Sequence, residues 1–173
     1  MNELVVHRVQ KADLLALQEI SRQTFFDAFG EVNTNEDMNH YLEVNLSMEQ
    51  LTLEFDNPST SFYFAKNGKE TLAYLKLNEL DAQTEKRAMP SMEIERIYVR
   101  KEFQNSGVGQ FLLDHSIQIT KDKKLNLIWL GVWEHNVSAI RFYERNQFQL
   151  FGKHAFMLGS DEQTDLLMER FLD

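Results

Sequence analysis

Gln104-Asn105-Ser106-Gly107-Val108-Gly109 is the most informative segment of this chain, because it joins a strand-like run at 92–99 to a helix-like run at 108–120. A strand that enters a glycine-containing turn and then a helix aims unpaired backbone N–H groups and the positive end of the helix dipole at one point. The two glycines carry no Cβ, so the backbone can approach a phosphate oxygen closely. The segment therefore predicts a site for a phosphate or pyrophosphate group.

Hydrophobic periodicity and turn signals on both sides of this segment predict further strands and helices. On the N-terminal side we expect a strand at 5–9, a helix from Asp13, two helices that begin near Thr34 and Ser47, a hairpin over 62–78 that turns at Asn67-Gly68, and a loop at 81–90. On the C-terminal side we expect a strand at 125–133, a helix at 136–146, and strands at 148–152 and 164–170. This order predicts an α+β fold with a central βαβα crossover.

Length and composition favour one domain that spans residues 1–173, and a hydrophobic content of 43% is enough to form a core. The chain has no cysteine, which excludes disulfides, thiol nucleophiles and Cys-ligated zinc, and is typical of a reducing cytoplasm. Its start lacks the basic and apolar segments of a secretory signal, and charges interrupt each apolar run before it reaches membrane-spanning length. We therefore expect a cytoplasmic protein.

Charge argues against one class of partner. The chain has 18 basic and 27 acidic residues, a formal net charge of −9, which repels nucleic-acid phosphates and attracts cations. His115, His135 and His154 are scattered without the spacing of a ligand pair, so no metal is expected. These observations exclude DNA and RNA as expected partners and favour a cationic substrate.

Two motifs in this chain resemble the signature of the GCN5-related N-acetyltransferase (GNAT) family. The first is an apolar-x-Val strand end followed by Gln/Arg-x-x-Gly-x-Gly/Ala, and the second is Asn-x-x-Ala-x-x-Phe-Tyr. The residues that match are Val99, Gln104, Gly107 and Gly109, then Asn136, Ala139, Phe142 and Tyr143. The resemblance extends from Val5 to Met168. Lys101 and Gln147 depart from it, since the family often has Pro and Gly at these positions, which affects loop stiffness and capping.

The resemblance implies the GNAT fold: a single mixed, mostly antiparallel sheet flanked by helices, with a splayed central parallel strand pair that holds acetyl-CoA. It also implies which residues bind this cofactor. The turn amides would hold the pyrophosphate, the backbone near the end of the strand would pair with the pantetheine arm, and the helix motif would contact the arm and the sulfur. The residues in question are Ile97, Tyr98, Val99, Gln104, Asn105, Ser106, Gly107, Val108, Gly109, Asn136 and Tyr143.

Acetyl transfer to an amine needs a deprotonated amine, a stabilised oxyanion and a protonated leaving thiolate. Tyr143 is the candidate acid toward the coenzyme A thiolate, although its position on an apolar helix face also suits a core aromatic. Glu95 is the candidate base, acting through water, and a solvent-facing strand residue is the alternative reading. Glu93 shares its strand face and could substitute. Asn136 is a candidate ligand that also suits a helix N-cap.

Segments 94–98, 128–134 and 161–165 resemble the PaiA-type spermidine/spermine N-acetyltransferases more closely. This resemblance implies a polyamine acceptor, acetylated in a ternary complex. Carboxylates between Phe25 and Leu46 could pair with its ammonium groups, in a groove that the corresponding helices of the family cover: Asp27, Glu31, Glu36 and Asp37. Solvated helix surface is the alternative for each of them.

Other readings stay open at the level of sequence. The acceptor could be another amine, such as a protein N-terminus, a lysine or an aminoglycoside, because the cofactor residues do not distinguish them. A non-catalytic acyl-CoA-sensing module would retain the same turn, although the presence of both Glu95 and Tyr143 argues against it. A nucleotide hydrolase is disfavoured because no Lys follows Gly109 in a P-loop pattern. Relatives often form homodimers, and no sequence feature selects this state.

Overall fold

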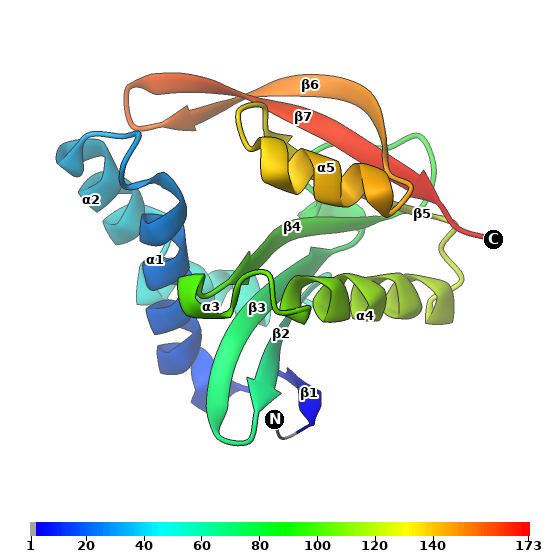
Figure 1. Cartoon of the computed structure of the whole chain (residues 1–173), viewed down its shortest axis with the longest axis horizontal. Helices are drawn as coiled ribbons and strands as arrows, with labels where there is room; N and C mark the ends of the chain where they lie inside the picture. The colour runs from blue at the N-terminus through cyan, green and yellow to red at the C-terminus, as the bar shows by residue number, and fades with distance from the viewer. Residues whose placement is uncertain (1–2) are drawn as a thin grey trace.

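The computed structural model describes residues 3–173, and its centre is a seven-stranded sheet (Figure 1). The strands are β1 (Leu4–Arg8), β2 (Thr60–Asn67), β3 (Glu70–Asn78), β4 (Met92–Val99), β5 (Leu127–Trp133), β6 (Gln149–Leu158) and β7 (Asp161–Phe171). Their order in the sheet is β1-β2-β3-β4-β5-β7-β6. All neighbouring pairs are antiparallel except β4 and β5, so the expected mixed, mostly antiparallel sheet with a central parallel pair is confirmed.

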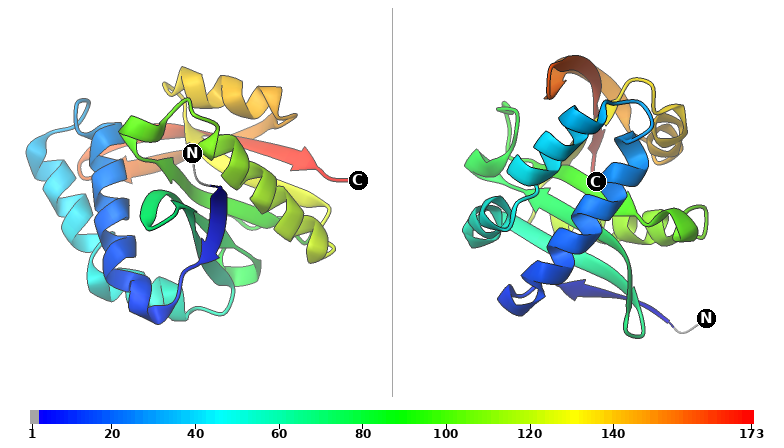
Figure 2. Two further views of the ribbon diagram at one scale, coloured as in Figure 1. Left: turned by 60° about the horizontal axis from the view of Figure 1, so that its bottom comes forward. Right: turned by 90° about the vertical axis from the view of Figure 1, so that its left-hand side faces the viewer.

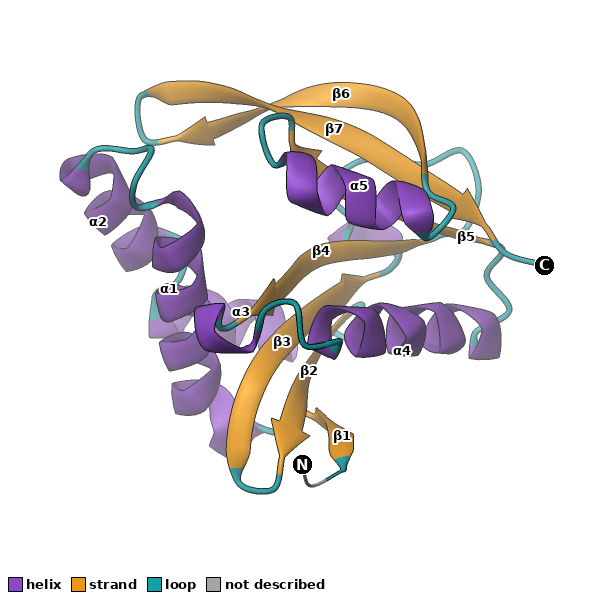
Figure 3. Ribbon diagram, in the orientation of Figure 1, coloured by secondary structure: helices purple, strands orange, loops and turns teal. Residues whose placement is uncertain are grey.

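Five α-helices flank this sheet (Figure 3): α1 (Leu14–Phe29), α2 (Asn35–Val44), α3 (Met48–Asp56), α4 (Val108–Asp122) and α5 (Val137–Arg145). Their starts follow from local chemistry. The side chains of Thr34 and Ser47 accept hydrogen bonds from Asp37 N and Gln50 N, both at 3.1 Å, so the two helix starts expected near Thr34 and Ser47 are confirmed.

The parallel pair separates soon after it forms. Met92, Glu93 and Ile94 of β4 pair with Ile128, Trp129 and Leu130 of β5. Beyond these pairs β4 continues along β3 and β5 continues along β7. The sheet is therefore split at its centre, and the backbone of the last part of β4 faces the opening.

A β-bulge lies at the start of the opening. Lys76 of β3 pairs with Arg96, whereas the next residue, Leu77, pairs with Ile94, so Glu95 is the extra residue of β4. The apolar residues Ile94 and Ile97, on either side of the bulge, both pack toward α4 and α5. The bulge therefore places Glu95 and Arg96 together on the opposite face of the sheet.

Separate apolar clusters attach the helices to the two faces of the sheet. One contains residues of α4 and α5 with β3, β4 and β5, and includes Val108, Leu112 and Tyr143. Two others attach α1, α2 and α3 to the opposite face and to β6, around Phe64 and Phe25. Figure 2 shows α3 and α4 on opposite sides of the strands. Both faces of the sheet centre, where it splits, are thus covered by helices.

Three local expectations need correction. The hairpin turn is Gly68-Lys69 rather than Asn67-Gly68, since Asn67 still pairs with Glu70 and the positive φ of 62° falls on Gly68. The strand expected at 148–152 extends to Leu158, because its pairing with β7 continues past a register shift near Gly152. The strand expected from residue 125 begins at Leu127. In the described part of the chain, no helix has the length and apolarity that a membrane span requires.

Candidate active site

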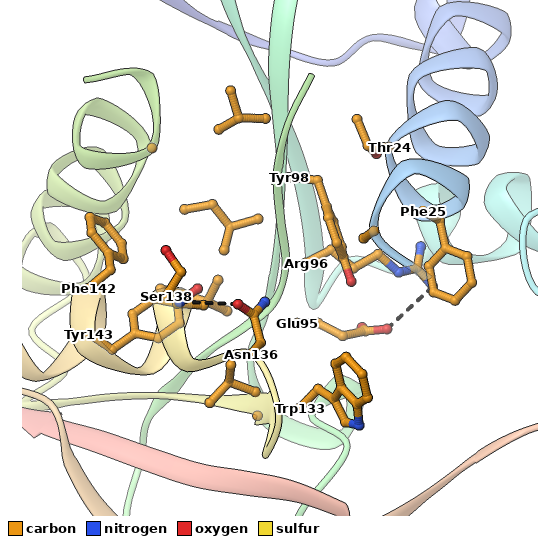
Figure 4. Close-up of a pocket in the computed structure, with 18 of the residues that line it drawn as sticks. Thr24, Phe25, Glu95, Arg96, Tyr98, Trp133, Asn136, Ser138, Phe142 and Tyr143 are labelled. Atoms are coloured by element: carbon orange, nitrogen blue, oxygen red, sulfur yellow. Dashed lines mark hydrogen bonds and ion pairs between the residues drawn. The ribbon is translucent and has the colours of Figure 1, made fainter. Parts of the chain in front are cut away.

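A cavity of about 840 Å³ lies where β4 and β5 separate. Figure 4 shows Ser138, Phe142 and Tyr143 on one side of β4, and Phe25 and Glu95 on the other. We call the first part the turn half, which the 104–109 turn, α4 and α5 bound, and the second part the α1 half, which α1, α2, β6 and β7 bound. The cavity therefore connects the phosphate-type turn with a second, separately walled space.

The 104–109 turn presents its backbone to the turn half. The first backbone hydrogen bond of α4 runs from Phe111 N to Gly107 O, so the amides before Phe111 have no acceptor within the helix. Asn105 and Gly107 have positive φ angles of 58° and 89°, which curl the turn into a concave row of N–H groups. A Cβ added at Gly107 would meet no atom within 4 Å. This geometry suits an anion such as a pyrophosphate.

Backbone alternation determines which groups of β4 face the opening. Arg100 N donates to Leu72 O of the β3 side, so Tyr98, two residues earlier, also points its backbone groups toward β3. Ile97 and Val99 then direct their N–H and C=O groups the other way, into the opening. Gln104 Nε2 donates to Val99 O at 3.3 Å and ties the turn to this strand end. The opening can thus accept an extended ligand as an added strand.

The N-cap and the last turn of α5 supply side chains to the turn half. Asn136 Oδ1 accepts a hydrogen bond from Ala139 N at 3.1 Å, so Asn136 is the N-cap of α5 and its Nδ2 is left for a ligand. Tyr143 is 7% exposed and packs against Phe142 and Phe148. Burial raises the pKa of the Tyr143 phenol well above its usual value, which keeps the proton on its oxygen.

Glu95 belongs to a network that joins β3, β4 and α3. Its Oε2 lies 2.5 Å from Lys76 Nζ and accepts from Asn78 Nδ2, while Arg96 lies 3.4 Å from Oε1. Lys76 is buried and also lies 3.0 Å from Glu54 of α3, which accepts two hydrogen bonds from Arg96. Two carboxylates and two cations therefore balance one another and hold the Glu95 side chain in one place.

The pKa directions within this network follow from its pairing. Burial acts to raise the pKa of Glu54, but Arg96 and Lys76 outweigh it and the pKa is lowered. Burial disfavours the charge of Arg96, but Glu95 and Glu54 outweigh it and raise the guanidinium pKa. Pairing thus favours the charged forms of Glu54 and Arg96 although burial disfavours them.

Glu93 has a different environment. It is 2% exposed, its Oε2 accepts from Thr84 N at 2.8 Å, and its Oε1 accepts from the Thr84 hydroxyl. Asn78 Nδ2 adds a bond at 3.3 Å. Burial raises the pKa of Glu93, and the bonds from Thr84 offset only part of this effect. Because both oxygens are engaged, Glu93 fastens the 80–91 loop to the sheet.

The α1 half combines aromatic walls with a second carboxylate. Phe29 and Trp133 lie 6.0 Å apart between ring centroids, and Tyr41 and Phe156 lie 6.2 Å apart. Asp165 pairs across the sheet with Trp133, and a Cβ added at Gly131 would lie 3.4 Å from its Oδ2. The lack of a side chain at Gly131 therefore leaves room for the Asp165 carboxylate beside β5. Aromatic faces and carboxylates together attract cations.

The site residues expected from sequence divide into three groups. Glu95, Ile97, Tyr98, Val99, Gln104, Asn105, Gly107, Gly109, Asn136 and Tyr143 all line the cavity. Ser106 and Val108 lie outside its lining: the Ser106 hydroxyl donates to Phe103 O, and Val108 is 3% exposed in the core, so only their backbone can serve. Of the carboxylates expected on the groove helices, Asp27 lines the cavity, whereas Asp37 accepts from the Thr34 hydroxyl at the start of α2 and Glu31 and Glu36 are exposed.

A model of the acetyltransferase (GNAT) family matches residues 15–148 of this chain. The chain belongs to this family. It is 40% identical over 172 residues to an uncharacterized N-acetyltransferase of Lactobacillus delbrueckii subsp. lactis, which covers 99% of each chain. It is 33% identical over 64 residues to a spermine/spermidine N(1)-acetyltransferase of Bacillus subtilis, 36% of this chain and 42% of that protein. The fold of PaiA N-acetyltransferase from Thermoplasma acidophilum, crystallised with coenzyme A, superposes with a TM-score of 0.77 at 20% identity, over 98% of this chain and 99% of that one.

The protein is thus an acetyl-CoA-dependent N-acetyltransferase of GNAT type. The residues of the turn half fit this cofactor, because the free amides before Phe111, the open space beside Gly107 and the strand edge at Ile97 and Val99 suit its pyrophosphate and its extended arm.

Sequence reasoning missed several groups that shape the α1 half. Lys76, Asn78 and Glu54 reach Glu95 from β3 and α3, and their pairing depends on the bulge, which no local pattern announces. Asp165 and His154 meet through the register of β6 and β7. One sequence signal could have identified Asp165. Side chains of β7 alternate between the two faces of the sheet, and Asp165 shares the inward face with Gln163 and Leu167.

Proposed function

We propose that this enzyme transfers the acetyl group of acetyl-CoA to a primary amine of an aliphatic polyamine such as spermidine or spermine, in a ternary complex. The observation that carries the proposal is the α1 half of the cavity, where aromatic rings surround the carboxylates of Glu95 and Asp165. An aliphatic polyammonium ion needs such a combination, since its methylene groups pack on rings and its charges pair with carboxylates. The formal charge of −9 adds long-range attraction for a polycation.

The relatives support the same acceptor class. A protein named spermine/spermidine N(1)-acetyltransferase in Bacillus subtilis shares a segment of this chain, and a PaiA N-acetyltransferase shares its fold. A peptide N-terminus carries a single charge beside a polar backbone, and an aminoglycoside is bulkier and richer in hydroxyl groups. Neither ligand would contact both the aromatic walls and several carboxylates as fully as a polyamine would.

Within this proposal, acetyl-CoA supplies an acetyl group that is activated as a thioester. The amides from Asn105 to Gly109 would hold its pyrophosphate, because the Gln104 amide already donates to Lys101 O, and the backbone of Ile97 and Val99 would hold its arm, with the Val99 N–H directed where an oxyanion can be stabilised. Asn136 Nδ2 donates to the arm. Tyr143 holds a proton at its oxygen for the leaving group, because burial keeps the phenol protonated.

Glu95 attracts the protonated amine and takes its proton, through water, at the edge of the split between β4 and β5. Lys76 and Asn78 hold the Glu95 carboxylate from the β3 side, so it stays oriented while the amine exchanges its proton. Since Lys76 and Arg96 already compensate much of its charge, a water molecule that bridges Glu95 and the amine is the expected relay.

The test is release of free coenzyme A from acetyl-CoA by the purified enzyme with spermidine, spermine, putrescine, lysine, a peptide with a free N-terminus and an aminoglycoside, with mass spectrometry of each product. We expect kcat/KM to be highest for the polyamines. A higher kcat/KM for the peptide or the aminoglycoside would refute the proposed acceptor class while leaving the acetyltransferase chemistry intact.

A further inference from the structure

We propose that Asp165 binds a second ammonium group of the acceptor while the reacting amine lies toward Glu95, an inference that rests on the polyamine acetylation proposed above. Asp165 would then determine specificity, because a monoamine could use the reaction site but gain nothing from this second position.

Among the described residues, the one side-chain donor near the Asp165 carboxylate lies as far away as 3.5 Å, whereas the other carboxylates of the cavity have closer partners. Glu95 contacts Lys76, Glu93 accepts from Thr84, and Asp27 accepts from Gln23 at 2.9 Å. Within residues 3–173, a single basic side-chain atom lies within 4.0 Å of the Asp165 carboxylate, namely His154 Nε2 at 3.5 Å. A carboxylate that lines a cavity with so little compensation is ready to bind a cation from solution.

His154 lies closer to another carboxylate than to Asp165. Its Nδ1 lies 2.7 Å from Glu85 Oε1, a good hydrogen-bond distance, whereas its Nε2 lies 3.5 Å from Asp165 Oδ2. Burial raises the pKa of Asp165, and His154 offsets only part of this effect. An ammonium group beside Asp165 would supply a closer charge and closer hydrogen-bond donors.

Asp165 and Glu95 stand at opposite ends of the space above Gly131. Glu93 of β4 pairs with Trp129 of β5, and Trp133 of β5 pairs with Asp165 of β7. Glu95 and Asp165 are therefore separated by two steps between neighbouring strands and by two residues along the strand direction. At about 4.8 Å per strand and about 3.3 Å per residue, their backbones are at least about 12 Å apart. The Glu95 carboxylate is held by Lys76 on the β3 side, whereas Asp165 Oδ2 lies beside Gly131 and 3.5 Å from His154 Nε2. Two amines joined by an aliphatic chain suit this separation better than one ammonium group shared by both.

The space between the two carboxylates suits an aliphatic chain. Gly131, which has no side chain, lies beside Asp165, and the walls of the space include Phe29, Trp133 and Phe156. These rings can cover methylene groups, and their faces add attraction for the adjacent charge. The occupant that this space favours is therefore a linear diamine or polyamine.

The experiment compares Asp165→Asn with Glu162→Gln, a control that removes an exposed carboxylate from the same strand. For each variant kcat and KM are measured with spermidine and with n-butylamine. We expect Asp165→Asn to raise the KM for spermidine at least about tenfold, which corresponds to about 1.4 kcal/mol. Its KM for n-butylamine and for acetyl-CoA should not change, and Glu162→Gln should match the wild type. Asp165→Glu keeps the charge and should retain the preference for spermidine.

The possible failures are distinguishable. If the wild type acetylates other amines but not spermidine, the proposed function is wrong and the role of Asp165 falls with it. If the wild type prefers spermidine, but Asp165→Asn changes the KM for spermidine and n-butylamine equally or not at all, polyamine acetylation stands and the second ammonium position is wrong. Thermal melting of each variant shows whether it is folded. If Asp165→Asn does not fold, the kinetics of Asp165→Glu with spermidine and n-butylamine provide the test. Loss of the preference for spermidine in a folded Asp165→Glu variant would overturn the assignment.

Discussion

Substitution of Gly109 by Ala separates the stability of this enzyme from its cofactor binding. Gly109 is the second residue of α4, and an added Cβ would meet only Val99 Cγ2, at an ordinary contact distance of 3.8 Å. The folded chain therefore tolerates the methyl group. Replacing Gly with Ala in a helix stabilises by about 0.5–1 kcal/mol, and a chain of this size gains about 2–4 °C in Tm per kcal/mol. We expect Tm to rise by about 1–4 °C.

Binding should move in the opposite direction. Gly109 lines the cavity at the point where the amides before Phe111 face outward, so the methyl group would hold a phosphate away from them. Loss of one hydrogen bond to a charged group costs about 1.5–3 kcal/mol. This loss corresponds to coenzyme A binding about ten- to a hundredfold more weakly. Calorimetric titration of coenzyme A and a melting curve of the same preparation measure the two effects.

Gly107→Ala is the matched comparison. Its φ of 89° disfavours any L-residue, although a Cβ there would touch nothing within 4 Å, so this variant should lose about 1–2 kcal/mol of stability through backbone strain alone. Both glycine variants should bind coenzyme A weakly while their Tm values shift in opposite directions. Wild-type coenzyme A affinity in Gly109→Ala would refute the placement of the pyrophosphate at this turn.

Three further outcomes test the remaining groups. Tyr143→Phe should lower kcat at least about tenfold, because the general acid is lost, while acetyl-CoA affinity and Tm stay near wild type; an unchanged kcat removes the acid role. Glu95→Gln should depress the rate most at low pH, where the amine is most protonated, and a loss equal at every pH would mean that Glu95 only supports Lys76. The folded-state pKa of Asp165 is raised, so the wild type loses stability as the pH rises from the unfolded value of 3.8 through the raised one. Urea unfolding should therefore show that Asp165→Asn becomes more stable relative to the wild type across that pH range. Parallel plots of unfolding free energy against pH for the two proteins would contradict this reasoning.

The features that the sequence predicted well depend on near neighbours along the chain. The turn at Gly107 and the caps at Thr34 and Ser47 involve residues within a few positions of one another, so their spacing alone carries the information. The family motifs added the positions of Asn136 and Tyr143 beside the opening. The positions of these residues could be predicted because each occupies a recognisable place in a single helix motif.

The features that could not be predicted depend on strand register. Residues 76 and 95 meet only because β3 and β4 pair as they do, and Asp165 meets His154 through the pairing of β6 with β7. A shift of one residue in either register would place these side chains on the other face. Gln147 shows the converse: it departs from the expected glycine and still adopts a φ of 67°, so the tertiary structure overrides a local preference.

The extra residue in β4 lets two consecutive side chains, Glu95 and Arg96, face the acceptor space. If Glu95 were deleted, Arg96 would follow Ile94 directly, the pairing with β3 would become regular, and the remaining residues of the strand would keep their faces. The sheet could therefore close over the loss, while the site would lose its candidate base. Any chimera that transplants this acetyltransferase's specificity into a relative should move residues 92–99 as one block, since the insertion and the carboxylate that it carries belong together.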